Sequence, residues 1–129
     1  MTTPTTGATG PYKVFVLISA SIPVLIFVQV LLAGLSIYYD GSLLEAHKAL
    51  GMLIALPVVS MVLLALRYDD LRQNLSRASV LLVLYCLQVG LMSIGREAGN
   101  GFLQALHVPN AFIIGAFSDF VARQARKRL

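Results

Sequence analysis

Charged side chains leave four long gaps in this chain. The stretches without Lys, Arg, Asp or Glu are 26, 18, 18 and 21 residues long, at 14–39, 49–66, 78–95 and 98–118. A helix needs about 20 apolar residues to cross a hydrocarbon core of ~30 Å. Of the 129 residues, 57% are hydrophobic and 12% are charged, which leaves little of the chain for a soluble domain. We therefore predict an all-α fold, a four-helix transmembrane bundle.

The expected helices follow from these gaps and from the turn residues between them. They cover about residues 12–38, 43–66, 76–95 and 102–125. A flexible N-terminal lead rich in Thr, Gly and Pro, residues 1–11, precedes this single transmembrane domain, residues 12–129. Because the connections are short, we expect an up-down-up-down order of helices.

Two helix starts carry local signals. Ser42, with Glu45 three residues later, predicts a capping box at the start of the second helix. The start of the fourth helix has two interpretations. Either the helix begins near Phe102 and bends at Pro109, or Pro109 lies in its first turn and His107 lies just before it.

Other classes of protein fit the sequence less well. The apolar stretches are continuous and lack the alternation of a transmembrane β-strand. The first stretch is too long for a cleaved signal peptide, and only Lys13 precedes it, so we interpret it as a retained helix. Cys86 is the sole cysteine and can form no intramolecular disulfide. The sequence contains no nucleophile–base pair, phosphate loop or thiol motif.

The basic residues predict an orientation in the membrane. Eight of the ten flank the first helix, the middle loop or the C-terminal tail: Lys13, Arg67, Arg72, Arg77, Arg123, Arg126, Lys127 and Arg128. Only Lys48 and Arg96 belong to the opposite side. The positive-inside rule then places both termini in the cytoplasm. This placement explains the net charge of +4 without a nucleic-acid partner.

The two histidines of the chain stand in matching places. His47 begins the second apolar helix and His107 the fourth, so both are expected at similar depth on the outer side. A weak internal repeat supports the match, since His47 follows Gln29 by 18 residues and His107 follows Gln88 by 19. The second and fourth helices can be diagonal partners in a bundle, which lets both imidazoles point at one central space.

Two facing imidazoles suit a planar tetrapyrrole better than zinc. A closed zinc site takes four ligands, whereas haem iron takes two axial ligands from protein. Small residues one turn below each histidine, Gly51 and Ala111, leave room for a flat ring. We therefore predict His47 and His107 as haem b ligands. The predicted cofactor-contacting residues are Gln29, Gly51, Gln88, Asn110 and Ala111.

Simpler interpretations exist for the same residues. A histidine near a helix end is often an interfacial residue with its polar edge in water. Buried glutamines such as Gln29 and Gln88 often serve only as hydrogen-bonding groups between helices.

The motifs AHKALG at the second helix and LHVPNA at the fourth resemble small transmembrane b-type cytochromes. They look most like a family of compact four-helix bacterial membrane proteins with such histidines, over about residues 12–125. The resemblance implies one b-type haem with His47 and His107 as its axial ligands. The chain departs from the larger two-haem families because it lacks a second, cytoplasmic pair of histidines.

Two functions follow as expectations. The first is electron transfer, at most as one subunit of an oxidoreductase: a bis-histidine haem near the extracytoplasmic side exchanges electrons with a quinone or a redox partner protein. The second is a non-catalytic accessory subunit of a larger respiratory or photosynthetic membrane complex, with or without a bound pigment. The small residues Ala33, Gly34 and Gly90 would suit packing on such a partner. A transporter ranks third, because no charged residue is expected at the midplane.

Overall fold

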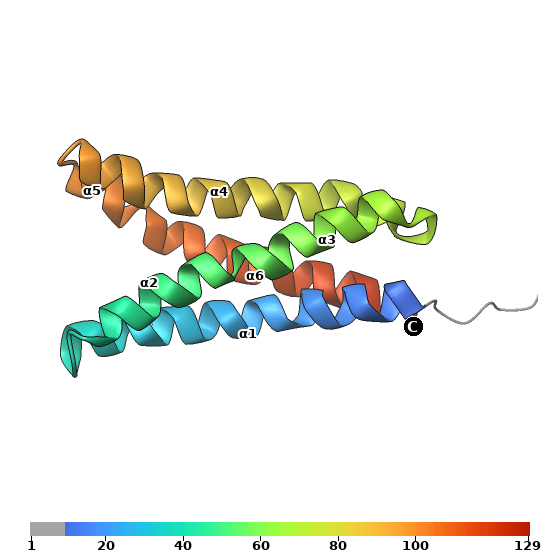
Figure 1. Cartoon of the computed structure of the whole chain (residues 1–129), viewed down its shortest axis with the longest axis horizontal. Coiled ribbons are helices and arrows are strands. Elements are labelled where there is room, and N and C mark those ends of the chain that lie inside the picture. The colour runs from blue at the N-terminus through green and yellow to red at the C-terminus, as the bar shows by residue number, and fades with distance from the viewer. Residues whose placement is uncertain (1–9) are drawn as a thin grey trace, which may run out of the picture.

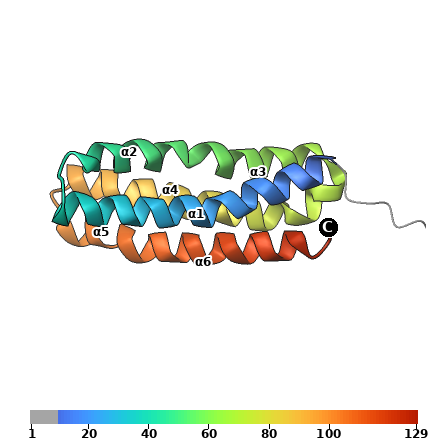
Figure 2. The ribbon, with the colours of Figure 1, turned by 90° about the horizontal axis from the view of Figure 1, so that it is seen from below.

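The computed structural model describes residues 10–129, and over this range the chain is all-α. Four long helical spans run back and forth along one axis (Figures 1 and 2). The elements are α1 (Gly10–Tyr38), α2 (Leu43–Leu53), α3 (Ala55–Arg67), the 3-10 helix η1 (Asp69–Asn74), α4 (Leu75–Glu97), α5 (Gly101–Ala105) and α6 (His107–Arg126). The predicted four-helix, all-α fold is confirmed.

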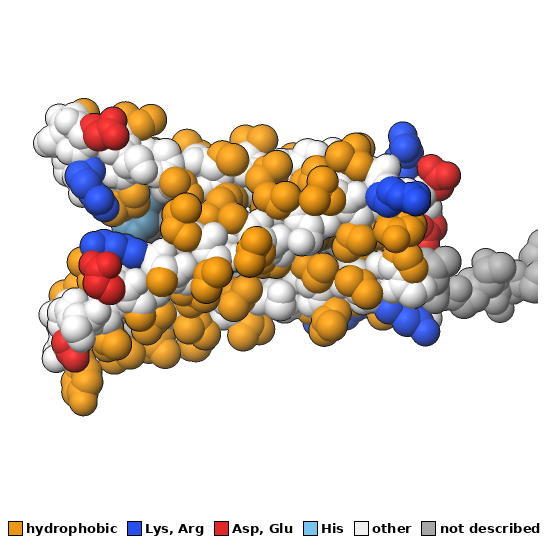
Figure 3. Space-filling view, in the orientation of Figure 1, with side chains coloured by type: hydrophobic (Ala, Val, Ile, Leu, Met, Phe, Trp, Pro, Cys, Tyr) orange, Lys and Arg blue, Asp and Glu red, His pale blue; other side chains and the backbone are white. Residues whose placement is uncertain are grey.

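Each of the four spans is long and apolar enough to cross a membrane. In the most apolar window of each span, only 17% to 28% of the residues are buried inside the protein. Apolar side chains therefore cover the middle of the surface, and charged side chains lie at its two ends (Figure 3). A surface of this kind is stable in a lipid bilayer and not in water. The chain is an integral membrane protein.

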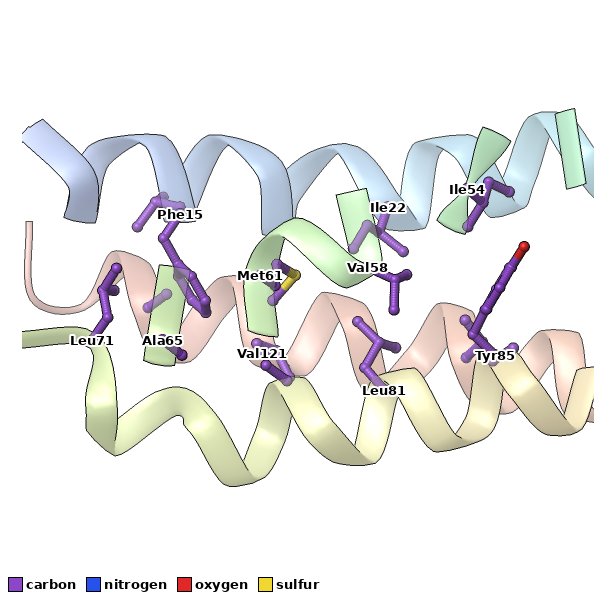
Figure 4. Close-up of a cluster of buried hydrophobic side chains, with 14 of the residues drawn as sticks. Phe15, Ile22, Ile54, Val58, Met61, Ala65, Leu71, Leu81, Tyr85 and Val121 are labelled. Carbon is purple, nitrogen blue, oxygen red and sulfur yellow. The ribbon is translucent and has the colours of Figure 1, made fainter. Parts of the chain in front are cut away.

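A narrow core runs down the axis of the bundle. Its fully buried members come from every span: Phe15, Ile22, Ile54, Val58, Met61, Leu71, Leu81, Ile114 and Val121 (Figure 4). On the second span Ile54, Val58 and Met61 are buried, and on the fourth Ile114 and Ser118 are buried.

The second and fourth spans lie diagonally across the bundle. Each packs mainly on one of the other two spans at one end of the bundle and on the other of them at the opposite end. At one end α2 packs on α1, and the start of the fourth span packs on α4. At the other end α3 packs on α4, and α6 packs on α1, where the Tyr12 hydroxyl donates to the Ala125 carbonyl at 3.0 Å. In Figure 1, α3 therefore crosses in front of α6.

This change of packing partners opens the bundle at the end that carries both histidines. There the α1–α2 hairpin and the hairpin of α4 with α5 diverge, whereas the opposite ends of the spans converge (Figure 1). Neither α2 nor α5 contains a buried residue. Figure 3 shows the surface hollowed at this end between the two hairpins, and we call this hollow the notch. Ile54, at the end of α2, and Tyr85, on α4, are buried below it.

Both diagonal spans break at the same place relative to a proline. The breaks fall at Ile54 and Leu106, three residues before Pro57 and Pro109. Proline has no N–H, so the carbonyl four residues earlier loses its helical partner. Those carbonyls belong to Leu53 and Ala105, the last residues of α2 and α5.

The fourth span combines the two interpretations of its start. The helix begins at Gly101, close to Phe102, but it breaks at Leu106, before Pro109 itself. His107 is then the first residue of α6, and Pro109 lies in the first turn of that helix. Asn100 caps α5, since its side-chain oxygen accepts from the amides of Phe102 and Leu103.

Most of the predicted lead, residues 1–11, lies outside the described residues, and Gly10 and Pro11, the two that are described, are helical. One local prediction is wrong. The predicted capping box is absent, because the Ser42 side chain makes no capping bond. Instead Asp40 Oδ1 accepts from the Ser42 amide at 2.9 Å, and Glu45 pairs with Lys48 at 2.6 Å.

Candidate functional site

His47 and Gln29 hold α2 and α1 together through two reciprocal hydrogen bonds. His47 Nδ1 lies 3.0 Å from the Gln29 carbonyl oxygen, and Gln29 Nε2 donates to the His47 carbonyl at 2.7 Å. A carbonyl oxygen only accepts, so Nδ1 carries the ring hydrogen and Nε2 keeps a lone pair. This tautomer is the one in which metal-ligating histidines are commonly held, with the far N–H on a carbonyl.

Gly51 makes room for this contact. A Cβ at position 51 would lie 2.8 Å from Gln29 Nε2 and would displace the amide. The space above Gly51, which we predicted for a cofactor, is therefore filled by the Gln29 side chain. The same amide nitrogen lies 3.5 Å from His47 Nε2, at the outer limit of a hydrogen bond. Gln29 Oε1 is buried and has no partner among the described residues.

His107 is held in the same tautomer but only by its own span. Its Nδ1 lies 2.6 Å from the Gln104 carbonyl oxygen, three residues earlier. Nδ1 is again the donor, and Nε2 is again left with a lone pair. Like His47, His107 is half-buried. In the described part of the chain, no hydrogen bond ties its side chain to another of the four spans.

Gln88 pairs with Asn110 and not with a histidine. Asn110 Nδ2 donates to Gln88 Oε1 at 2.7 Å and to the Leu84 carbonyl at 3.1 Å. Asn110 is 5% exposed and Ala111 is 8% exposed, so α6 is firmly seated on its neighbours just below His107. The predicted residues thus form two clusters, one in each hairpin. The sequence repeat does not extend to their hydrogen bonds.

Tyr85 is a residue that our sequence reasoning missed. Its hydroxyl donates to the Gly51 carbonyl at 3.0 Å, next to the break at Ile54, and so ties α4 to α2 at the floor of the notch (Figure 4). The available signal was a tyrosine in the middle of an apolar stretch. A buried hydroxyl at membrane depth has to find an acceptor.

Two cations stand at the histidine end of the molecule. Lys48 and Arg96 are the only basic residues on that side, and Figure 3 shows Lys and Arg side chains on both sides of a histidine at the notch. Lys48 pairs with Glu45, whereas no ion pair within the described residues involves Arg96. Both are exposed, and the acidic residues Asp40, Glu45 and Glu97 are exposed at the same end, so this end carries charges of both signs.

The site offers two imidazoles as its ligand set. Within residues 10–129, no three His, Cys, Asp or Glu side chains lie close enough together to hold a metal ion. A metal held by protein atoms alone would lack ligands here, whereas a metal that arrives in a macrocycle needs only the two axial nitrogens.

The chain matches one family model, described as a family of unknown function (DUF6220), over residues 29–94. The matched segment covers half of the chain and includes Gln29, His47, Gly51 and Tyr85, but it ends before His107. No curated protein and no solved structure gives a significant match.

Proposed function

The chain belongs to the DUF6220 family of unknown function, and we propose that it binds one haem b between His47 and His107 at the notch. One observation carries the proposal. Both imidazoles donate Nδ1–H to a backbone carbonyl, which leaves Nε2 as an acceptor, on diagonal helices at the end where the hairpins diverge. The Gln29 amide nitrogen lies 3.5 Å from His47 Nε2 and would have to turn aside for a ligand. Two Nε2 acceptors are what axial ligation of haem requires.

The proposed role of the bound haem is one-electron transfer, exchanged with a quinone or with a redox partner protein. Two axial histidines leave no position for substrate, which favours electron transfer over oxygen chemistry. The protein contributes the ligands, the apolar floor at Ile54 and Tyr85, and the orientation of the site. On this proposal the chain is an electron-transfer component and carries no catalytic residue of its own.

The proposed location is a bacterial inner membrane, with the notch on the extracytoplasmic side. The two described ends, Gly10 and Leu129, lie at the same end of the bundle (Figure 2). That end also carries eight of the ten basic residues, which favours its retention in the cytoplasm.

The test is a reduced-minus-oxidised visible spectrum of the protein purified in mild detergent. We expect sharp low-spin α and β bands, and we expect His47→Ala and His107→Ala each to abolish the low-spin form. The exposed α4 residue Ser93 provides a control, since Ser93→Ala should leave the bands unchanged. A flat spectrum from folded parent protein would disprove haem binding.

A second candidate function is that of an accessory subunit without a redox role. It is favoured by the Gln29–His47 contacts, because the Nδ1–H of His47 and the side-chain amide of Gln29 each already donate to a backbone carbonyl and need no cofactor as a partner. It is also favoured by an apolar groove of about 310 Å³ on the lipid-facing side of α4 and α5, lined by Cys86, Leu87, Gly90, Leu91, Ile94 and Leu103. Chain that is monodisperse and redox-active without other proteins would rule this candidate out.

A further inference from the structure

The lipid-facing side of the bundle carries a groove of about 360 Å³ where α1 lies beside α6 (Figure 2). We propose that this groove seats one acyl chain of an anionic phospholipid, whose phosphate pairs with Arg126. The groove extends from the end of the bundle opposite the notch. The proposal therefore does not depend on the proposed haem site.

One wall of the groove comes from α6. Asp119, Ala122 and Arg126 follow one another at intervals of three and four residues, so they share one face of the helix. Ala122 is 2% exposed and forms the floor. Helical side chains lean toward the N-terminus of their helix, so the Arg126 side chain reaches back from the end of the bundle along the groove.

The opposite wall comes from α1 and is apolar. It consists of Ala20, Pro23, Val24 and Phe27, which also recur on one face of their helix. Val24 and Phe27 are 61% and 70% exposed, so they stand out from the surface on the lipid side of the floor. The small side chain of Ala20 leaves space between these walls at the middle of the groove.

The polar and apolar parts of the groove follow the order of a lipid molecule. The Tyr12 hydroxyl donates to the Ala125 carbonyl, so Arg126 lies at the level where α1 begins. Ala20 and Phe27 follow Tyr12 by eight and fifteen residues, which places them about 12 and 22 Å deeper along the bundle. A phospholipid in the adjacent leaflet has its phosphate at the first level and its acyl chains at the second.

The charges at the groove favour an anionic headgroup. Asp119 is paired with Arg123 at 2.7 Å, which offsets its negative charge. Within residues 10–129, no ion pair involves Arg126. A guanidinium group can bind a phosphate through two parallel hydrogen bonds. Basic sites between transmembrane helices are typical binding sites for anionic headgroups.

The size of the groove favours an acyl chain over a helix of another protein. Two turns of a helix about 10 Å across occupy roughly 800 Å³. The groove holds less than half of that volume, so a helix would lie across its opening and leave Ala122 uncovered. A single acyl chain can enter between the two walls and reach the floor.

The experiment is a lipid titration of delipidated, detergent-solubilised full-length protein, followed by native mass spectrometry. The probes are phosphatidylglycerol and phosphatidylcholine with identical acyl chains. We expect one tightly retained phosphatidylglycerol, bound about fivefold or more tightly than phosphatidylcholine, since one basic side chain contributes about 1 kcal/mol toward an anionic lipid.

Two pairs of variants separate the charge from the groove. Arg126→Gln should abolish the preference for phosphatidylglycerol, whereas Lys127→Gln removes the same charge from the same tail, outside the groove, and should keep it. Ala20→Leu should weaken the binding of both lipids because it fills the groove. Ala116→Leu adds the same bulk at an exposed position of α6 that does not line the groove, and it should bind lipid as the parent does.

Several outcomes would overturn the proposal. Equal affinity of the parent for the two lipids, or equal losses in Arg126→Gln and Lys127→Gln, would reduce the effect to a diffuse attraction of the basic tail. Unchanged binding in Ala20→Leu would place the acyl chain elsewhere. A dimer of the parent that Ala20→Leu dissociates would make the groove an interface between two copies of this chain. Retention of oleate as strong as that of phosphatidylglycerol would assign the groove to free fatty acids.

Discussion

Gly95 shows how a single missing side chain sets the geometry of the histidine end. It is buried, and a Cβ there would lie 2.9 Å from the backbone nitrogen of Gln104 and 3.2 Å from the Asn100 carbonyl oxygen. Backbone atoms cannot move aside cheaply, unlike the end of a flexible side chain. Gly90, five residues earlier on α4, has no atom within 4 Å of its own Cβ position.

This pair gives a prediction at the residue scale. Gly95→Ala should lower the free energy of unfolding by about 1–3 kcal/mol, because it overpacks the contact between α4 and α5. Gly90→Ala should leave stability unchanged or raise it by up to ~1 kcal/mol, since alanine is the better helix former. Unfolding in mixed micelles, followed by circular dichroism, measures both. Equal effects of the two substitutions would contradict the close packing at Gly95.

At the scale of the element, the turn before α2 depends on Asp40. The Asp40 carboxylate accepts from the Ser42 amide, and this bond, with a further contribution from the Ser42 side chain, lowers the pKa of Asp40 below its ordinary value of 3.8. A lowered pKa in the folded state means that the ionised form stabilises the turn. The contribution is therefore present at neutral pH and is lost as the pH falls through that lowered pKa.

We accordingly predict that Asp40 contributes more than Ser42 to the start of α2. Asp40→Ala should speed hydrogen exchange of the amides at 42–45, because the turn loses its side-chain acceptor. Ser42→Ala should speed this exchange less than Asp40→Ala, since it removes only the smaller contribution of the Ser42 side chain and keeps the bond from the Ser42 amide to Asp40. In the parent, the same loss of protection should appear only below pH 3.8. Faster exchange in Ser42→Ala than in Asp40→Ala would restore the capping box that the sequence predicts.

At the scale of the whole molecule, the distribution of charge allows a direct test of orientation. The turn at Ser42 lies at the histidine end, and η1, which contains Gln73, lies at the opposite end. In a Cys86→Ala background, Ser42→Cys should react in intact cells with a maleimide that cannot cross membranes. Gln73→Cys should react only after the cells are opened. The reverse pattern would place the notch in the cytoplasm.

The four spans show most clearly which features could be predicted from the sequence and which depended on the structure. The number of spans could be predicted, because a bilayer demands about 20 uncharged helical residues for each crossing. The capping box predicted wrongly at Ser42 depends on one or two residues at a helix end. Such ends are set by local contacts that the periodicity of a sequence does not report.

For the candidate site, the sequence by itself determined which residues are available: two histidines at the ends of two apolar helices, and two glutamines opposite them. Only the tertiary structure decided how they pair. His47 meets Gln29, whereas Gln88 meets Asn110 and leaves His107 to its own span. The physical reason is the break at Leu106, which separates α5 from α6. The ring of His107 bonds back to Gln104 of α5, and Asn110, three residues further along α6, takes the position that faces Gln88.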